Sequence, residues 1–226
     1  MTLIALGLAV APIAALTFYF YYRDKHEKEP VSMLVKAFAF GVVSVAPALL
    51  LEWLFEGLGV TAGKSLFMTA ISAFIGVGLV EEYCKFFFIK RYLYKSEHFN
   101  EPYDGIIYSV MVSLGFAGIE NIFYVIQGGT EVAILRMFTA VPAHAMFGTL
   151  MGYFIGLAKF QPGKEGRMYL GLLFATIFHG AYDFFLFVQN IPGMFIGAII
   201  SLLAGIYYAR RAMRMHIDSS PFREDA

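Results

Sequence analysis

The sequence predicts an all-α, polytopic membrane protein, a bundle of about seven transmembrane helices in a single domain, residues 1–226. Hydrophobic residues make up 59% of the chain and charged residues only 15%, whereas soluble domains are about 45–50% apolar and about 25% charged. Several apolar runs reach the roughly 18 residues that signal a membrane-spanning helix. The net charge is zero, so no overall positive field indicates a nucleic-acid partner. We therefore expect this chain to lie in a lipid bilayer.

The apolar runs follow one another along the chain with short polar connections between them. The first, residues 3–22, lacks the basic leader of a cleavable signal peptide and is predicted to be a retained helix. Six further runs are predicted to be spans, at residues 33–55, 67–89, 105–127, 133–158, 168–188 and 193–209. Because no linker or low-complexity segment separates these runs, we expect a single domain.

Basic residues gather in alternate connections, which predicts the orientation of the chain. Most basic residues lie in or beside the first, third and fifth connections: Arg23, Lys25, Lys28, Lys36, Lys90, Arg91, Lys95, Lys159, Lys164 and Arg167. The C-terminal tail adds Arg210, Arg211, Arg214 and Arg223. The second and fourth connections contribute only Lys64 and Arg136, and the sixth contributes none. The positive-inside rule therefore places the N-terminus outside and the C-terminus in the cytoplasm, and this alternation requires an odd number of spans.

The third predicted span contains charged residues that a bilayer does not tolerate without a reason, in the run Gly78-Leu-Val-Glu-Glu-Tyr-Cys-Lys85. A charged side chain at the middle of a bilayer costs roughly 2.5–3.5 kcal/mol even on insertion scales. At about 100° per residue, Lys85 lies between Glu81 and Glu82 on the helix surface. One interpretation is a buried ion pair beside a protonated carboxyl group. The other is a catalytic acid and base, with Lys85 keeping one carboxylate ionised while its neighbour supplies a proton.

Three other predicted spans contribute ionisable side chains. The span at 105–127 carries Glu120, four residues after Phe116, and the span at 168–188 carries His179 and Asp183, four residues apart. Asp183 can orient the imidazole of His179 or stabilise its charge. The span at 133–158 carries His144. Glycines follow it at every fourth position on the same helix face, namely Gly148, Gly152 and Gly156, and such a row of small residues lets a neighbouring helix approach closely.

A structural role is a reasonable alternative for each of these residues alone, such as a core histidine bonded to a backbone carbonyl. Ionisable groups on four helices are better explained by a functional site, because such residues inside a membrane are rare and usually functional. The candidate catalytic residues are Glu81, Glu82, Glu120, His144, His179 and Asp183. At about 1.5 Å per residue, Glu120 and Asp183 come out several ångströms nearer the outer surface than the others, and Glu120 is the weakest member. Glu52 is interpreted as a solvated residue at the interface, and Cys84 as a small buried apolar residue rather than a nucleophile.

The motifs of several intramembrane hydrolases are absent. The zinc motif H-E-x-x-H does not occur, because His26-Glu27 lies in a connection and Pro30 stands where the second histidine is required. A G-x-S-G serine elbow is also absent, and of the paired-aspartate motifs only Tyr103-Asp104 is present, at a helix entrance. The remaining option is a glutamate-based site.

Together these motifs resemble the PrsW family of bacterial intramembrane proteases. The resemblance covers nearly the whole chain and rests on Glu81-Glu82-x-x-Lys85, Phe116-x-x-x-Glu120-Asn121, His144, His179-x-x-x-Asp183, Asp24-Lys-His-Glu-Lys-Glu-Pro30 and Tyr103-Asp-Gly-Ile-Ile-Tyr108. It implies a multi-pass protein of the bacterial cell membrane. The implied partner is a single-pass membrane protein, an anti-sigma factor that receives its first (site-1) cut on the extracytoplasmic side after envelope stress.

The PrsW family is similar in turn to the CAAX prenyl protease and bacteriocin-processing superfamily, whose motifs are E-E-x-x-x-R, F-x-x-x-H and H-x-x-x-N/D. This similarity implies that Glu81 is the general base, that Glu82 supports it, and that His179 and Asp183 stabilise the oxyanion. The sequence departs from the pattern twice. Glu120 stands where the superfamily has histidine, and Lys85 replaces an arginine one residue further on. His144 is therefore a candidate for the missing imidazole.

Three alternatives stay open at this point. A glutamate-type site requires no cofactor and we expect none, but two histidines and up to four carboxylates can also hold zinc, as in a membrane metalloprotease. A proton-coupled transporter uses buried acids and histidines as a relay, although such proteins are usually built from repeated halves and no repeat is visible here. A non-catalytic membrane scaffold related to the protease fold requires no activity.

Overall fold

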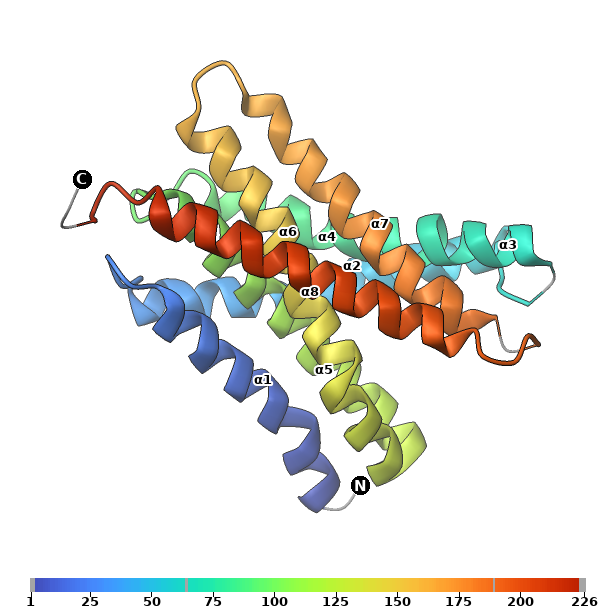
Figure 1. Cartoon of the computed structure of the whole chain (residues 1–226). Coiled ribbons are helices and arrows are strands. Elements are labelled where there is room, and N and C mark those ends of the chain that lie inside the picture. Colours follow the sequence, from blue (N-terminus) through green and yellow to red (C-terminus); the bar gives the residue numbers. More distant parts are fainter. Residues whose placement is uncertain (1–2, 64, 189, 224–226) are drawn as a thin grey trace.

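The computed structural model describes residues 3–63, 65–188 and 190–223, and these residues form helices and connecting turns without any strand. The long elements in chain order are α1 (Leu3–Arg23), α2 (Val31–Gly57), α5 (Pro102–Phe138), α6 (Ala140–Phe160), α7 (Met168–Phe187) and α8 (Phe195–Asp218). Between α2 and α5 a continuous helical rod runs through α3 (Leu66–Ile71), the π-helical η1 (Ser72–Leu79), α4 (Val80–Phe88) and the π-helical η2 (Ile89–Leu93). A short 3-10 turn, η3 (Glu165–Arg167), precedes α7. The prediction of an all-α membrane protein is therefore confirmed (Figure 1).

Six helical stretches among the described residues are long and apolar enough to cross a membrane, and one of them contains two crossings. This stretch, Pro102–Phe160, has 59 residues and breaks at Gly129, whose φ of 70° is accessible to glycine at little cost. Its two arms fold back on each other as a hairpin. Gly148 on the second arm lies so close to Ser113 on the first that an added Cβ atom would be 2.6 Å from Ser113 Oγ. The fourth and fifth predicted spans correspond to the two arms of this hairpin.

The first arm of the hairpin is the centre of the bundle. Every residue from Tyr103 to Ala117 in α5 is buried, and α5 contacts α1, α2, α6, α8 and the rod around it. The predicted small-residue stripe explains the close approach of α6. A Cβ atom on Gly152 would collide with the carbonyl oxygen of Gly105, and one on Gly156 with that of Pro102. Large apolar side chains instead point outward on the peripheral helices, as expected for a surface that faces lipid.

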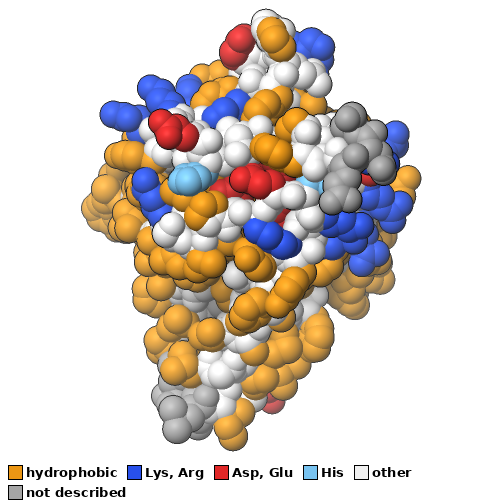
Figure 2. Space-filling model, turned by 90° about the vertical axis from the view of Figure 1, so that its left-hand side faces the viewer, with side chains coloured by type: hydrophobic (Ala, Val, Ile, Leu, Met, Phe, Trp, Pro, Cys, Tyr) orange, Lys and Arg blue, Asp and Glu red, His pale blue; other side chains and the backbone are white. Residues whose placement is uncertain are grey.

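Basic side chains mark one end of the bundle. Figure 2 shows this end, where Lys and Arg side chains surround a group of acidic ones and hydrophobic side chains cover the part below. The end of α1 and the end of α8 both reach this face, whereas the start of α1 lies at the far end beside the turn of the α5–α6 hairpin (Figure 1). Asp24, directly after α1, is fully buried here, and burial raises its pKa to about 7, with the neighbouring Glu101 carboxylate adding to the effect.

Candidate active site

Lys85 lies at the centre of a buried charge cluster on α4. Its Nζ atom donates hydrogen bonds to Glu81 Oε2 at 3.0 Å and to Glu82 Oε1 at 2.7 Å, and its side chain is fully buried. The same ammonium lies 4.0 Å from the ring centroid of Phe116 on α5, close enough for a cation–π interaction. The predicted position of Lys85 between the two glutamates is therefore correct, and its charge is shared between them.

His179 on α7 completes this cluster from the opposite side. Its Nδ1 atom lies 3.0 Å from Glu82 Oε1, and its Nε2 atom lies 3.3 Å from Asp183 Oδ2 and 3.9 Å from Glu81 Oε2. Both ring nitrogens thus face carboxylate oxygens, an arrangement that a doubly protonated imidazolium satisfies by donating from each. The ring also stacks on Phe147, with the centroids 4.5 Å apart, which fixes its plane.

His144 on α6 joins a second carboxylate to the same cluster. Its Nε2 atom lies 2.7 Å from Glu120 Oε2, and its Nδ1 atom lies 3.3 Å from Lys85 Nζ. Because an ammonium can only donate, Nδ1 is the acceptor and Nε2 carries the proton that Glu120 accepts. Glu120 also forms an ion pair with Arg136, whose Nη2 atom is 3.1 Å from Oε1. The residue that the sequence supported least is therefore part of the cluster.

Two features of the backbone bring α4 and α7 together. The π-helical segments η1 and η2 flank α4 on both sides, and each wider turn rotates the residues that follow. Glycines make the contact itself, since a Cβ atom on Gly78 would lie 3.1 Å from the backbone nitrogen of Gly180. Because Gly180 follows His179 directly, this close approach sets the imidazole against Glu82.

A cavity of about 840 Å³ opens beside the cluster. Five of the six candidate residues line it, namely Glu81, Glu120, His144, His179 and Asp183. The lining extends to Gln127 near the turn of the α5–α6 hairpin and to Phe195 at the start of α8. Both positions belong to the end of the bundle away from the basic face. Glu82 is 0% exposed and does not line the cavity. It contacts Lys85 and His179, and His179 is a lining residue.

Three residues of this region were not among the predicted site residues. Glu52 was interpreted as a solvated interfacial residue, but it lines the cavity together with Tyr124 and Arg136. Arg136 was placed near the end of a connection, yet it belongs to α5 and binds Glu120 and Asn121. A signal for Arg136 existed, because an arginine between apolar runs needs a partner. Cys84 is buried among apolar side chains, in agreement with its predicted packing role.

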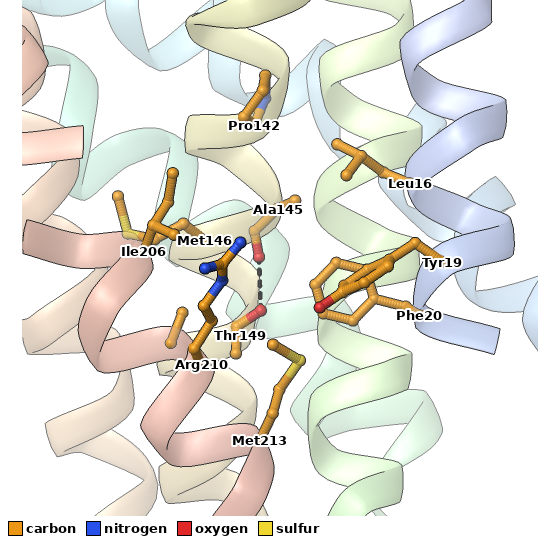
Figure 3. A pocket seen from close by; sticks show the side chains of 11 residues that line it. Leu16, Tyr19, Phe20, Pro142, Ala145, Met146, Thr149, Ile206, Arg210 and Met213 are labelled. Carbon is orange, nitrogen blue, oxygen red and sulfur yellow. Dashed lines mark hydrogen bonds between the residues drawn. The ribbon is translucent and has the colours of Figure 1, made fainter. Parts of the chain in front are cut away.

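A second cavity of about 240 Å³ lies elsewhere, between α1, α6 and α8. Figure 3 shows that Arg210 and Tyr19 are its only ionisable residues and that the other labelled side chains are apolar, apart from Thr149, whose hydroxyl donates 2.8 Å to the carbonyl oxygen of Ala145. This cavity contains none of the candidate catalytic residues. It therefore has no acid or base pair with which to perform hydrolysis.

The candidate residues also fit a metal ion by their donor types. Ligand atoms of Glu81, Glu120 and His144 lie within 4.8 Å of one another, and so do those of Glu81, Glu82 and His179. Imidazole nitrogens together with carboxylate oxygens are a donor set that zinc accepts. Lys85 contacts Glu81, which belongs to both groups, and His144. A metal ion bound to either group would therefore compete with the ammonium of Lys85 for the carboxylate of Glu81.

Fold and site together define a polytopic membrane protein with carboxylates and imidazoles gathered around a cavity of the helical bundle. The chain belongs to the PrsW family. The matching family model, "PrsW family intramembrane metalloprotease", covers residues 29–209. The chain is therefore a membrane-embedded peptidase, and a multi-pass protein of a bacterial membrane.

Curated relatives of similar length support this assignment. The chain is similar to Protease PrsW of Geobacillus kaustophilus, with 40% identity over 200 residues that cover 88% of this chain and 86% of the relative. It is 39% identical to Protease PrsW of Bacillus subtilis, over 80% of this chain and 82% of the relative. Protease PrsW of Clostridioides difficile is 36% identical, over 80% and 79%. No solved structure matches the chain.

Proposed function

We propose that this protein hydrolyses a peptide bond of a single-pass membrane protein within the bilayer, and that Glu81 activates the attacking water. The observation that carries the proposal is the different exposure of the two adjacent glutamates. Glu81 lines the large cavity, where water and an extended substrate can reach it, whereas Glu82 is fully buried behind it. Of the pair, Glu81 is therefore the carboxylate that can take a proton from water.

The remaining charged groups support this role for Glu81. Lys85 binds Glu81 and favours its ionised form, while Glu82 holds both Lys85 and His179 in place. We infer that the Nε2–H of His179, which lies 3.3 Å from Asp183 while Nδ1 is held by Glu82, turns from Asp183 to the oxyanion that forms when water adds to the carbonyl carbon. Its proton is then available to the amine that leaves.

His144 is the second imidazole at the cavity and a candidate proton shuttle. Its ring centroid lies 5.4 Å from that of His179, so one peptide group can contact both. Glu120 occupies the sequence position where the wider superfamily has histidine, and its carboxylate binds His144. We infer that α6 supplies the imidazole and that Glu120 orients it.

A zinc-dependent reaction is the second candidate, favoured by the two ligand groups that share Glu81 and by the description of the matching family. Glu81, Glu120 and His144 would hold the ion in one of these groups, and Glu81, Glu82 and His179 would hold it in the other. A zinc ion in such a site polarises a carbonyl group and lowers the pKa of its bound water. In both candidates the same carboxylates and imidazoles surround the reacting peptide.

The substrate side of the proposal rests on the cavity and on the family resemblance. The cavity extends to Gln127 and Phe195, on the side of the bundle away from the basic face, which the positive-inside rule places outside the cell. A site that opens outward is compatible with the first, extracytoplasmic cut of an anti-sigma factor.

Reconstitution of the full chain with a labelled single-pass substrate tests the function. Mass-spectrometric mapping of the products, with and without chelator, reports reaction, side and metal dependence together. Cleavage that chelator abolishes and zinc restores assigns the zinc-dependent reaction, and unchanged cleavage assigns the glutamate-type reaction. Absence of any cut in an anti-sigma factor of the same bacterium would count against the proposed substrate. Absence of a cut in every single-pass substrate would favour a transporter or a scaffold.

A further inference from the structure

A second group of carboxylates lies far from the candidate active site, at the end of the bundle where α1 ends and α5 begins. It is formed by the connection between α1 and α2 and by the start of α5, and it comprises Asp24, Glu27, Glu29, Glu101 and Asp104. Asp104 and Glu120 both belong to α5, sixteen residues apart, which is about 24 Å at ~1.5 Å per residue. The two groups are therefore separate sites.

The carboxylates of this group are buried without a direct ion pair among the described residues. Asp24, Glu29, Glu101 and Asp104 are each at most 2% exposed. Within the described part of the chain, no side-chain nitrogen of Lys, Arg or His lies within 4.0 Å of a carboxylate oxygen of these five residues. All ion pairs found there belong to the candidate active site. Buried anions without a partner cost several kcal/mol each, and either a bound proton or a bound cation removes this cost.

Three members of the group point oxygens at one another. Glu27, Glu29 and Asp104 each offer a carboxylate oxygen, and these oxygens all lie within 4.8 Å of one another. One oxygen of each is buried without a hydrogen-bond partner, namely Glu27 Oε2, Glu29 Oε1 and Asp104 Oδ1. Asp104 is fully buried, so its free oxygen is shielded from bulk water.

The opposite oxygens hold these side chains in place. Asp104 Oδ2 accepts the backbone N–H groups of Asn100 and Glu101, both at 2.7 Å, and Glu29 Oε2 accepts the hydroxyl of Tyr108. Glu27 Oε1 accepts the side-chain amide of Asn100 at 3.4 Å. Each carboxylate is thus anchored by one oxygen and leaves the other free. Metal ligands are commonly oriented by outer hydrogen bonds in this way.

We propose that Glu27, Glu29 and Asp104 form a binding site for a hard divalent cation, Mg²⁺ or Ca²⁺. The group contains only oxygen donors, which suit these ions, and no histidine or cysteine, which zinc prefers. The ion ties the connection after α1 to the first turn of α5. It therefore fastens the peripheral helices α1 and α2 to the central helix that carries Glu120.

Calorimetric titration of the full chain, purified in detergent and stripped with chelator, tests this site with MgCl₂ and CaCl₂ as probes. We expect saturable binding of one of these ions and a rise in Tm with its concentration, because an ion that binds only the folded state stabilises it. Glu27→Gln keeps the size and the amide contact but removes the charge, and we expect at least a tenfold loss of affinity. Glu29→Gln is expected to do the same.

Two matched variants locate the binding. Glu97→Gln removes an exposed acid from the neighbouring connection and is expected to bind like the unmodified chain. Glu81→Gln, in the candidate active site, is also expected to retain the ion. Loss of binding in Glu81→Gln, or equal weakening by Glu97→Gln and Glu27→Gln, overturns the proposed site. So does an absence of saturable binding combined with a higher Tm of Glu29→Gln in chelator, since that pattern shows a proton shared between Glu29 and Asp104.

Discussion

Glu120 Oε2 lies 2.7 Å from His144 Nε2, a contact that joins the two arms of the α5–α6 hairpin across the cavity. The other nitrogen of the same imidazole lies 3.3 Å from Lys85 Nζ. His144 therefore connects α5, α6 and α4 through one ring. Its position between a carboxylate and the ammonium that binds Glu81 makes it the link between the two halves of the candidate site.

His144→Ala is expected to lower kcat for cleavage by about 10²–10⁴-fold, the usual contribution of a positioned acid or base. Glu120→Gln keeps an oxygen that accepts from Nε2, so its loss is expected to be smaller. A cleavage assay with purified variants of matched helical content measures both. If His144→Ala cuts at the unmodified rate, His144 does not take the place of the missing histidine.

Glu81→Gln and Glu82→Gln are expected to fail in different ways. Glu81 faces the cavity, so its amide variant is expected to lose about 10²–10⁴-fold in kcat with little change in Tm. Glu82 holds two buried cations, so Glu82→Gln is expected to lower Tm as well as activity.

Parallel cleavage and thermal-unfolding measurements separate these two effects. Glu56→Gln, at an exposed acid near the end of α2, is the control for removal of a negative charge. The assignment of Glu81 as the base fails if Glu81→Gln cleaves like this control.

The sequence was sufficient to predict the fold class and to point to most of the side chains that the structure gathers at the candidate site, because both depend on local patterns. Apolar runs of spanning length identify the helices, and rare intramembrane charges identify Glu81, Glu82, His144 and His179. The single helical stretch through α5 and α6 was predicted as two spans, since Gly129 lies between two apolar runs.

Contacts between distant segments could not be predicted in the same way. The estimated depth of Glu120 assumed straight helices along the membrane normal, whereas the hairpin brings Glu120 directly against His144. The π-helical turns of η1 and η2 have no sequence signature, although they rotate the residues around α4. The Arg136–Glu120 ion pair likewise depends on the α5–α6 fold, and no spacing along the chain reveals it.

Lys85→Met is expected to destabilise the fold by about 3–5 kcal/mol, because it leaves two carboxylates buried without their cation. Methionine is close to lysine in size, so the effect reports charge rather than a cavity. The double variant Lys85→Met/Glu82→Gln removes one of the orphaned charges and is expected to recover part of this loss.

Thermal or denaturant unfolding in detergent gives the coupling between the two positions as a double-mutant cycle. Additive effects of the two substitutions would show that Glu82 does not depend on Lys85 for its charge compensation.

Gly180→Ala is expected to lower cleavage although alanine carries no functional group. The added Cβ atom would lie 2.5 Å from the ring of Phe74 and 2.8 Å from its Cα atom, so α7 must move away from η1. Overpacking of this kind typically costs about 1–3 kcal/mol. Because His179 precedes Gly180, the shift also lengthens the 3.0 Å contact between His179 and Glu82. Gly7→Ala is the matched control, since a Cβ atom there meets nothing within 4 Å. A Gly180→Ala variant with the Tm and kcat of Gly7→Ala would show that the close approach of α7 to the rod does not position the imidazole.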